Sequence, residues 1–125
     1  MATITGIGGF FLKVRDPAAT AKWFSDHLGM TMESWGGMFP WTDSKGYTVL
    51  GLHAKDSDYF TGSTREFMLN LRVDDLDGML AELAKKGITP VRTFPPEANG
   101  RFAHVPGPDG ITLELWQPAD EPPAP

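Results

Sequence analysis

Two segments of the chain repeat one pattern, and this repeat constrains the fold more than any other feature. The segments are FFLKVRDPAATAKWFSDHLGM (10–30) and FMLNLRVDDLDGMLAELAKKGI (67–88). Each begins as a strand-like run that ends in Val-x-Asp, and each continues as an amphipathic helix that stops at a glycine. When Asp16 is laid on Asp75, the offset is 59 residues. The chain is therefore predicted to contain two copies of one structural unit.

The predicted helices have local reasons to begin and end where they do. Asp16 can cap free backbone N–H groups, and Pro17 suits the first helical position, where no N–H is needed. The second helix carries a cleaner apolar stripe, formed by Leu76, Met79, Leu80, Leu83 and Ala84. Lys85 and Lys86 follow it, at the negative end of the helix dipole.

Strand-like stretches separated by turn residues follow each helix. They are predicted at 30–35, 38–42 and 47–53 in the first half, and at 89–93, 101–105 and 111–117 in the second. Both halves thus read βαβββ, and the fold class is α+β. Two such units, packed edge to edge or across a dimer, form a curved mixed sheet with the helices outside. The concave inner face is the natural ligand site.

The chain length, the net charge and the cysteine content limit the number of domains and the kinds of partner that we expect. The chain of 125 residues is predicted to form one domain over 1–118, with modules at about 5–56 and 65–118 and a flexible Pro-rich tail at 119–125. A net charge of −5 argues against nucleic acid and anionic membranes as partners. The chain has no cysteine, which excludes disulfides and thiolate ligands. It carries neither a signal peptide pattern nor a membrane-spanning run, so we expect a cytoplasmic, soluble protein.

One carboxylate interrupts the apolar pattern of the last predicted strand. Alternation places Ile111, Leu113 and Leu115 beneath a helix and Thr112, Glu114 and Trp116 on the opposite, inner face. If VPGPDG closes the hairpin symmetrically, His104 lies opposite Thr112 and Phe102 lies opposite Glu114. His104 and Glu114 are then diagonal neighbours, about 7 Å apart at the backbone. We predict this pair as the catalytic residues, and a one-residue slip of register would separate them.

Strand alternation, together with a cluster of aromatic residues beside Gly36-Gly37, predicts which residues line a ligand pocket. In the first strand of each unit, Phe10, Leu12 and Val14 and likewise Leu69, Leu71 and Val73 are predicted to lie under the helices. The predicted substrate-binding residues are Phe11, Trp35, Trp41, Met68, Asn70, Arg72, Phe102 and Trp116. The tryptophans either line a pocket for a flat ligand or form core and dimer contacts. His53 ends a strand and is predicted to reach the rim.

Three pieces of the sequence together resemble the vicinal oxygen chelate superfamily, which includes glyoxalase I, extradiol dioxygenases and the bleomycin and fosfomycin resistance proteins. They are the first Val-x-Asp helix start with WFSDHLGM, the second with VDDLDGMLAELAKKGI, and the closing GPDGITLELWQP. The closing piece looks like the family's Asp-Pro-Asp-Gly-Asn-x-x-Glu-Leu ending, with Gly107 and Ile111 replacing the Asp and the Asn. The resemblance covers residues 5–118 and implies the two-module fold, assembled as a homodimer.

The resemblance also implies where a divalent metal ion would bind. Family members that use metal hold it with His and Glu from the first and last strands of each module. The corresponding positions here hold Gly9, Met68, and Leu50 or Gly51, so that Glu114 alone matches. One carboxylate does not make a metal site, since three or four protein ligands are the normal requirement. We therefore predict no cofactor and disfavour a divalent metal.

Two classes of function follow from the resemblance. The first is an enzyme of the glyoxalase or dioxygenase type that acts without metal on a small oxygenated or aromatic molecule, with Glu114 as general base and His104 as proton shuttle. The second is a non-catalytic protein that sequesters a drug or toxin, as bleomycin resistance proteins do. The partner in both cases is a small molecule.

Overall fold

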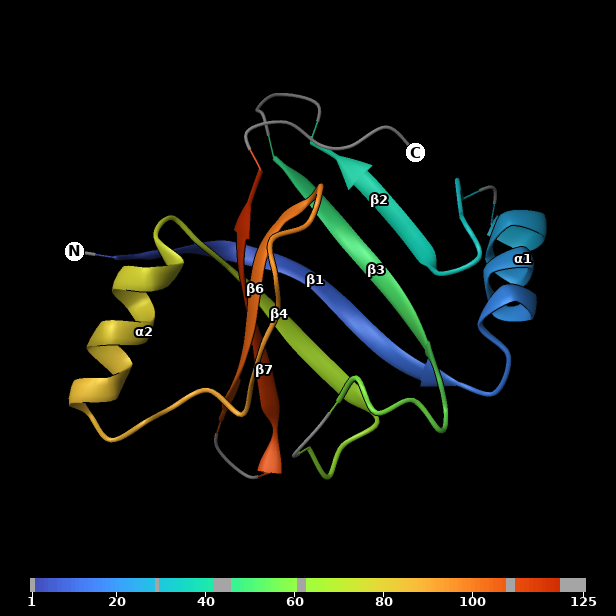
Figure 1. The fold of residues 1–125 in the computed structure, drawn as a ribbon. Helices are drawn as coiled ribbons and strands as arrows, with labels where there is room; N and C mark the ends of the chain where they lie inside the picture. The colour runs from blue at the N-terminus through green and yellow to red at the C-terminus, as the bar shows by residue number, and fades with distance from the viewer. Residues whose placement is uncertain (1, 29, 42–45, 61–62, 108–109, 120–125) are drawn as a thin grey trace.

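Seven strands form one mixed sheet in the computed structural model, which describes residues 2–28, 30–41, 46–60, 63–107 and 110–119. The order across the sheet is β2-β3-β1-β4-β7-β6-β5. Figure 1 shows the curved sheet between the two helices, which lie on opposite sides of the molecule. The α+β prediction is confirmed.

The sheet consists of two related halves joined at its centre. The first half holds β1 (Ile4–Val14), α1 (Pro17–Leu28), β2 (Gly36–Pro40) and β3 (Tyr47–Ala54). The second holds β4 (Phe67–Val73), α2 (Leu76–Lys85), β5 (Arg92–Thr93), β6 (Gly100–Pro106) and β7 (Thr112–Pro118). In each half the first strand pairs in parallel with the last, β1 with β3 and β4 with β7. Antiparallel pairing of β1 with β4 joins the halves edge to edge within one chain.

The helices begin where the sequence predicts. The Asp16 carboxylate accepts a hydrogen bond from the Ala19 N–H at 3.1 Å, and Asp75 accepts one from the Gly78 N–H at 3.0 Å. These bonds satisfy N–H groups that have no partner inside the helix. Gly87 follows α2 with φ of 82°, a conformation that glycine adopts without steric cost.

Two predictions about the first half are wrong. Residues 30–35 form no strand, because Glu33 and Gly36 pair with each other across a tight turn instead. Phe10, predicted to lie under α1, is 45% exposed and stacks on Phe67 with ring centroids 5.8 Å apart. The reason is the position of α1, which packs beside β3 at the side of the sheet and leaves this part of β1 uncovered.

The β6–β7 hairpin has a different register from the predicted one. His104 lies directly opposite Glu114, and Phe102 lies opposite Trp116. The loop closes through the Gly107 N–H and the Ile111 carbonyl, while the Gly110 carbonyl accepts a hydrogen bond from the Thr64 N–H. Gly110 is thereby kept out of the ladder, and each partner on β7 shifts by two residues. An even shift preserves the face, so His104 and Glu114 are closer than the diagonal arrangement predicted.

One of the hydrophobic core clusters lies where the second half meets its helix. Val73, Leu76, Ala103, Val105 and Leu115 form a buried cluster, against which the apolar stripe of α2 packs. Leu71, Val73, Leu113 and Leu115 thus pack under the helix as predicted. The opposite face of β4 and β7 turns toward the concavity. No described helix is long and apolar enough to cross a membrane. Apart from Ala119, the predicted flexible tail lies outside the described residues.

Candidate functional site

A buried carboxylate with three hydrogen-bond partners lies at the centre of the concave face. Glu114 is 0% exposed. Its Oε1 accepts a hydrogen bond from Asn70 Nδ2 at 2.6 Å, and its Oε2 lies 2.8 Å from His104 Nε2. The Tyr59 hydroxyl donates a further, short hydrogen bond to Oε2. A carboxylate this deeply buried needs such partners, since an unpaired charge in the interior is costly.

Strand register explains why these residues meet. Asn70 on β4 lies beside Glu114 on β7 in the parallel ladder, and His104 on β6 lies beside it on the other side. Side chains at one level of a sheet share a face, so three adjacent strands place three polar groups in a row. Tyr59 reaches the row from the segment that joins β3 to β4. Burial and the Glu114 carboxylate both raise the pKa of Tyr59, so its phenol stays protonated and acts as a donor.

A cavity of about 270 Å³ opens above this row. Five of the residues that line it carry large aromatic rings: Phe11, Trp35, Tyr59, Phe102 and Trp116. Phe102 and Trp116 are nearly parallel, with ring centroids 5.9 Å apart and an interplanar angle of 4°. The Trp116 indole N–H donates to the Asn99 carbonyl at 2.7 Å, which fixes that ring. The two rings are largely buried and form a rigid apolar part of the cavity wall.

The charges around the cavity are unevenly placed. Two carboxylates, Glu97 and Glu114, are among its lining residues, and no lysine or arginine is among the described ones. Arg72 lies behind the wall, with its guanidinium 5.2 Å from the Trp116 ring and 5.0 Å from the Trp41 ring. Arg92 likewise covers the Phe94 ring at 4.7 Å. The cavity therefore favours neutral or positively charged groups.

The structure brings together most, but not all, of the residues predicted from sequence. Five of the predicted substrate-binding residues line the cavity: Phe11, Trp35, Asn70, Phe102 and Trp116. Three do not. Met68 is 0% exposed and packs with Phe11 and Phe60 in the core, whereas Trp41 and Arg72 stack on each other outside the cavity. His104 is buried behind Glu114, so it contacts the cavity through its partner.

Sequence reasoning missed Tyr59, which supplies both a wall of the cavity and a hydrogen bond to Glu114. It lies in an irregular segment where alternation carries no information, although the aromatic pair Tyr59-Phe60 in a polar stretch was a signal. Its ring stacks on His53, with centroids 4.6 Å apart and an interplanar angle of 11°. His53, predicted at the rim, lines the cavity.

His53 provides a pH-dependent probe of the site. Burial lowers the pKa of its imidazole below the ordinary value of 6.5, and the Glu114 carboxylate opposes that change. We expect an NMR titration of the His53 ring to give a pKa below 6.5 in the wild type, and a still lower value in Glu114→Gln, which removes the carboxylate. A His53 pKa that rises in Glu114→Gln would contradict the arrangement. In the unfolded chain His53 has its ordinary pKa of about 6.5, so it binds a proton at a higher pH than in the folded protein. His53 therefore lowers the free energy of unfolding as the pH falls below about 6.5.

The residues present do not fit the metal site that the resemblance implies. Among the described residues, no group of three or more His, Cys, Asp or Glu side chains is placed to hold a metal ion. A Cβ at Gly9 would overlap the Val49 carbonyl oxygen on β3, and one at Gly51 would lie 3.0 Å from the Phe11 ring. The backbone at Gly9 therefore leaves no room for a ligating side chain, and His104 is already bonded to the one carboxylate that matches.

Solved structures with similar folds include several methylmalonyl-CoA epimerases. The enzyme from Mycobacterium tuberculosis is 23% identical, with 93% of this chain and 89% of that chain covered and a TM-score of 0.65. A methylmalonyl-CoA epimerase in complex with methylmalonyl-CoA and NH4+ is 20% identical, with 97% and 100% covered and a TM-score of 0.70. The Streptomyces coelicolor enzyme in complex with 2-nitronate-propionyl-CoA is 17% identical, with 98% and 100% covered and a TM-score of 0.70. These similarities show a shared fold.

No curated protein sequence matches the chain. A family model does match it, over residues 6–115, which span both halves of the sheet and Glu114. The match covers most of the chain, and it agrees with the two-module sheet and with the motifs that carry the resemblance. The chain belongs to the Glyoxalase/Bleomycin resistance protein/Dioxygenase superfamily.

Proposed function

We propose that this protein binds a small, flat, neutral or positively charged molecule in the aromatic cavity and holds it without a metal ion. The observation that carries the proposal is the composition of the cavity, which combines five aromatic walls and two carboxylates with no described lysine or arginine. A cation above an aromatic ring is attracted to the ring's negative face, and burial strengthens that attraction. The volume of about 270 Å³ suits a ring system of one or two rings.

In this proposal Glu114 is a positioning residue. Both of its oxygens already accept hydrogen bonds, and the side chain is 0% exposed. Tyr59 and Asn70, which it holds, are themselves cavity walls. The carboxylate thus orders the wall that a ligand touches, and it gives the cavity a negative potential. A non-catalytic binding protein needs nothing further from it.

Proton transfer is the second candidate function, with Glu114 as base and His104 as shuttle. It is favoured by one observation: the buried His104 Nδ1 has no hydrogen-bond partner among the described residues, while Nε2 faces Glu114. A histidine with one nitrogen toward a carboxylate and the other unengaged has the arrangement of a proton relay. This candidate requires a ligand to displace Tyr59 or Asn70 from the carboxylate, because both occupy it.

A matched set of one-ring probes tests the charge preference of the cavity. Benzylamine is a cation, benzyl alcohol is neutral and benzoate is an anion, at nearly equal size. We expect the first two to raise the unfolding temperature in proportion to their affinity, and benzoate to have no effect. Methylmalonyl-CoA, which carries a carboxylate, is expected not to bind in the cavity. Equal stabilisation by benzoate and benzylamine would overturn the proposed preference.

A pair of tryptophan variants tests where the probes bind. Trp35→Ala removes a cavity wall and is expected to weaken benzylamine binding about tenfold, the scale of one aromatic contact. Trp41→Ala is the matched control, since Trp41 is similarly exposed but lies outside the cavity. Isothermal titration gives both affinities. Equal losses in the two variants would exclude the cavity as the binding site.

Product analysis separates the two candidates. We expect every bound molecule to be recovered unchanged, and no exchange of its carbon-bound hydrogens with deuterated water. Exchange that is catalysed by the wild type and lost in Glu114→Gln would establish proton transfer instead.

A homodimer and a cytoplasmic location remain proposals. The exposed side chains of Ile7 and Phe10 on β1 support the former, and light scattering tests it.

A further inference from the structure

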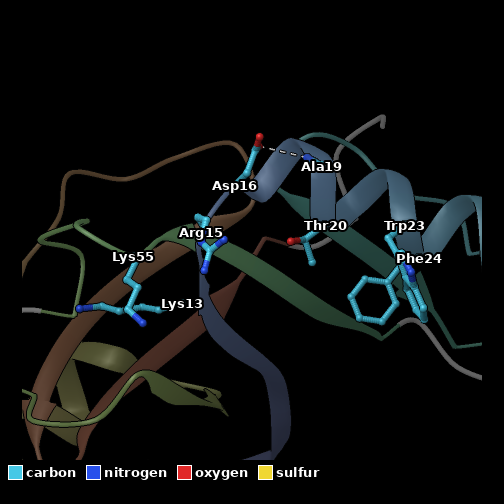
Figure 2. Close-up of a pocket in the computed structure, with 8 residues that line it drawn as sticks. All are labelled: Lys13, Arg15, Asp16, Ala19, Thr20, Trp23, Phe24 and Lys55. Carbon is cyan, nitrogen blue, oxygen red and sulfur yellow. Dashed lines mark hydrogen bonds between the residues drawn. The ribbon is translucent and has the colours of Figure 1, made fainter.

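A second hollow, separate from the ligand cavity, lies between the start of α1 and the ends of β1 and β3. It has a volume of about 530 Å³ and is lined by Lys13, Arg15, Asp16, Ala19, Thr20, Trp23, Phe24 and Lys55. None of these residues lines the aromatic cavity. Figure 2 shows the cationic side chains on one side of the hollow and the two aromatic rings on the other. We propose that this hollow binds a phosphate ester that carries an aromatic ring, the chemistry of a nucleotide.

The charge of the hollow runs against that of the whole protein. The chain has a net charge of −5, yet three of its 11 lysines and arginines, Lys13, Arg15 and Lys55, line this one surface. Asp16 is the one carboxylate among the lining residues, and it is engaged by the Ala19 N–H. Figure 2 shows its carboxylate pointing up toward the helix, away from the cations. A phosphate is the group that such a concentration of positive charge favours.

The cations are arranged so that a ligand can use them. The Lys13 ammonium lies 5.4 Å from the centre of the Phe60 ring, which supports it from one side. Lys55 is paired with Glu66 at 3.5 Å, but both side chains are largely exposed, so the pair is weak and exchangeable. Arg15 is exposed at the end of β1, and Figure 2 shows its guanidinium between the lysines and Thr20.

The opposite wall offers a surface for a ring. The Trp23 side chain is 50% exposed, and it meets Phe24 edge-on with centroids 5.6 Å apart and an interplanar angle of 90°. This contact orients the indole, and half of the residue's surface remains exposed to solvent. Stacking of a base on an exposed aromatic face is a common mode of nucleotide binding and does not depend on which base is present. Cations on one side and a ring on the other match the two ends of a nucleoside diphosphate.

Isothermal titration calorimetry with ADP, adenosine and inorganic pyrophosphate distinguishes the contributions of the cationic wall and the aromatic wall to binding. We expect ADP to bind more tightly than either fragment, and its affinity to fall as salt is added. Arg15→Gln combined with Lys55→Gln should weaken ADP and pyrophosphate about tenfold or more, since charge-assisted hydrogen bonds are lost. Trp23→Ala should weaken ADP and leave pyrophosphate unchanged. Lys86→Gln, which removes a lysine at the far end of α2, is the matched control and should bind like the wild type.

The proposal has clear contrary outcomes. If ADP shows no saturable binding at low salt, the hollow is not a phosphate site. If ADP binds no better than pyrophosphate, or if Trp23→Ala leaves ADP unaffected, the ring wall plays no part and the proposal is wrong. An equal loss in Lys86→Gln would indicate attraction to any surface cation. All four substituted residues are exposed, and circular dichroism checks that each variant is folded. Benzylamine, the probe of the aromatic cavity, should not compete with ADP.

Discussion

Glu114→Ala is expected to lower the free energy of unfolding by about 3–5 kcal/mol, the usual cost of removing one partner from a buried, hydrogen-bonded charged group. The variant leaves Asn70 Nδ2, the Tyr59 hydroxyl and His104 Nε2 facing an empty space, and each buried donor without a partner costs about 1–3 kcal/mol. The lost volume adds a cavity term. Urea denaturation followed by circular dichroism measures the change.

Two further variants show whether hydrogen bonding is the cause. Glu114→Gln keeps the volume of the side chain and places an amide oxygen and an amide nitrogen where the two carboxylate oxygens lie. We therefore expect a loss of unfolding free energy less than half that of Glu114→Ala. Glu33→Ala removes an exposed carboxylate and keeps the backbone hydrogen bonds between Glu33 and Gly36. It should change stability by about 0.5 kcal/mol or less. Similar small losses in all three variants would mean that the carboxylate does not organise the wall of the cavity, and the positioning role would fail.

Gly9→Ala is the second change with a large expected effect, a loss of about 3 kcal/mol or more. The added Cβ would overlap the Val49 carbonyl oxygen and would lie 3.1 Å from the Val49 Cβ, and the obstacle is backbone of the paired strand. Relief requires β1 and β3 to separate, which breaks ladder hydrogen bonds and disturbs the wall that Val49 contributes to the cavity. Thermal unfolding monitored at equilibrium measures the loss.

Gly6→Ala is the matched control for this variant. It lies on the same strand three residues earlier, and a Cβ there meets nothing within 4 Å. We expect its stability to equal or slightly exceed that of the wild type, because alanine restricts the unfolded chain. If Gly6→Ala and Gly9→Ala lose stability equally, strand flexibility is the cause, and the close approach of Val49 is not. The same steric argument predicts that Gly9→His would not create a metal site in the folded protein.

The sequence predicted the face of Glu114 correctly but not its neighbours. Alternation along 111–117 depends only on the period of a strand, so it placed Thr112, Glu114 and Trp116 together without knowledge of the fold. The register of the hairpin depends on how the loop closes, and here the Gly110 carbonyl is engaged by Thr64 from a distant segment. No local pattern reports such a contact, and the prediction was therefore shifted by two residues.

The first half of the chain illustrates a different kind of limit. Residues 30–35 have a strand-like composition, but the turn that pairs Glu33 with Gly36 prevails there. The placement of α1 beside β3 is decided by packing, and it determines that Phe10 is exposed and that Trp23 faces a hollow. Trp41 and Arg72 were each predicted to line the pocket, but they stack on each other behind its wall. Stacking of a guanidinium on an indole is favourable wherever the two groups are in contact.

By itself the sequence determined the repeated module, the helix boundaries, the superfamily and the inward face that carries Glu114. These features follow from periodicity and capping, which act over a few residues, and from motifs that recur at fixed spacing. Only the tertiary structure decided which groups hold the carboxylate, that Tyr59 lines the cavity, and that Gly9 has no room for a side chain. It also decided that Lys13, Arg15 and Lys55 line one hollow beside α1. Those are contacts between segments far apart in the chain, and they exist only once the sheet has brought the segments together.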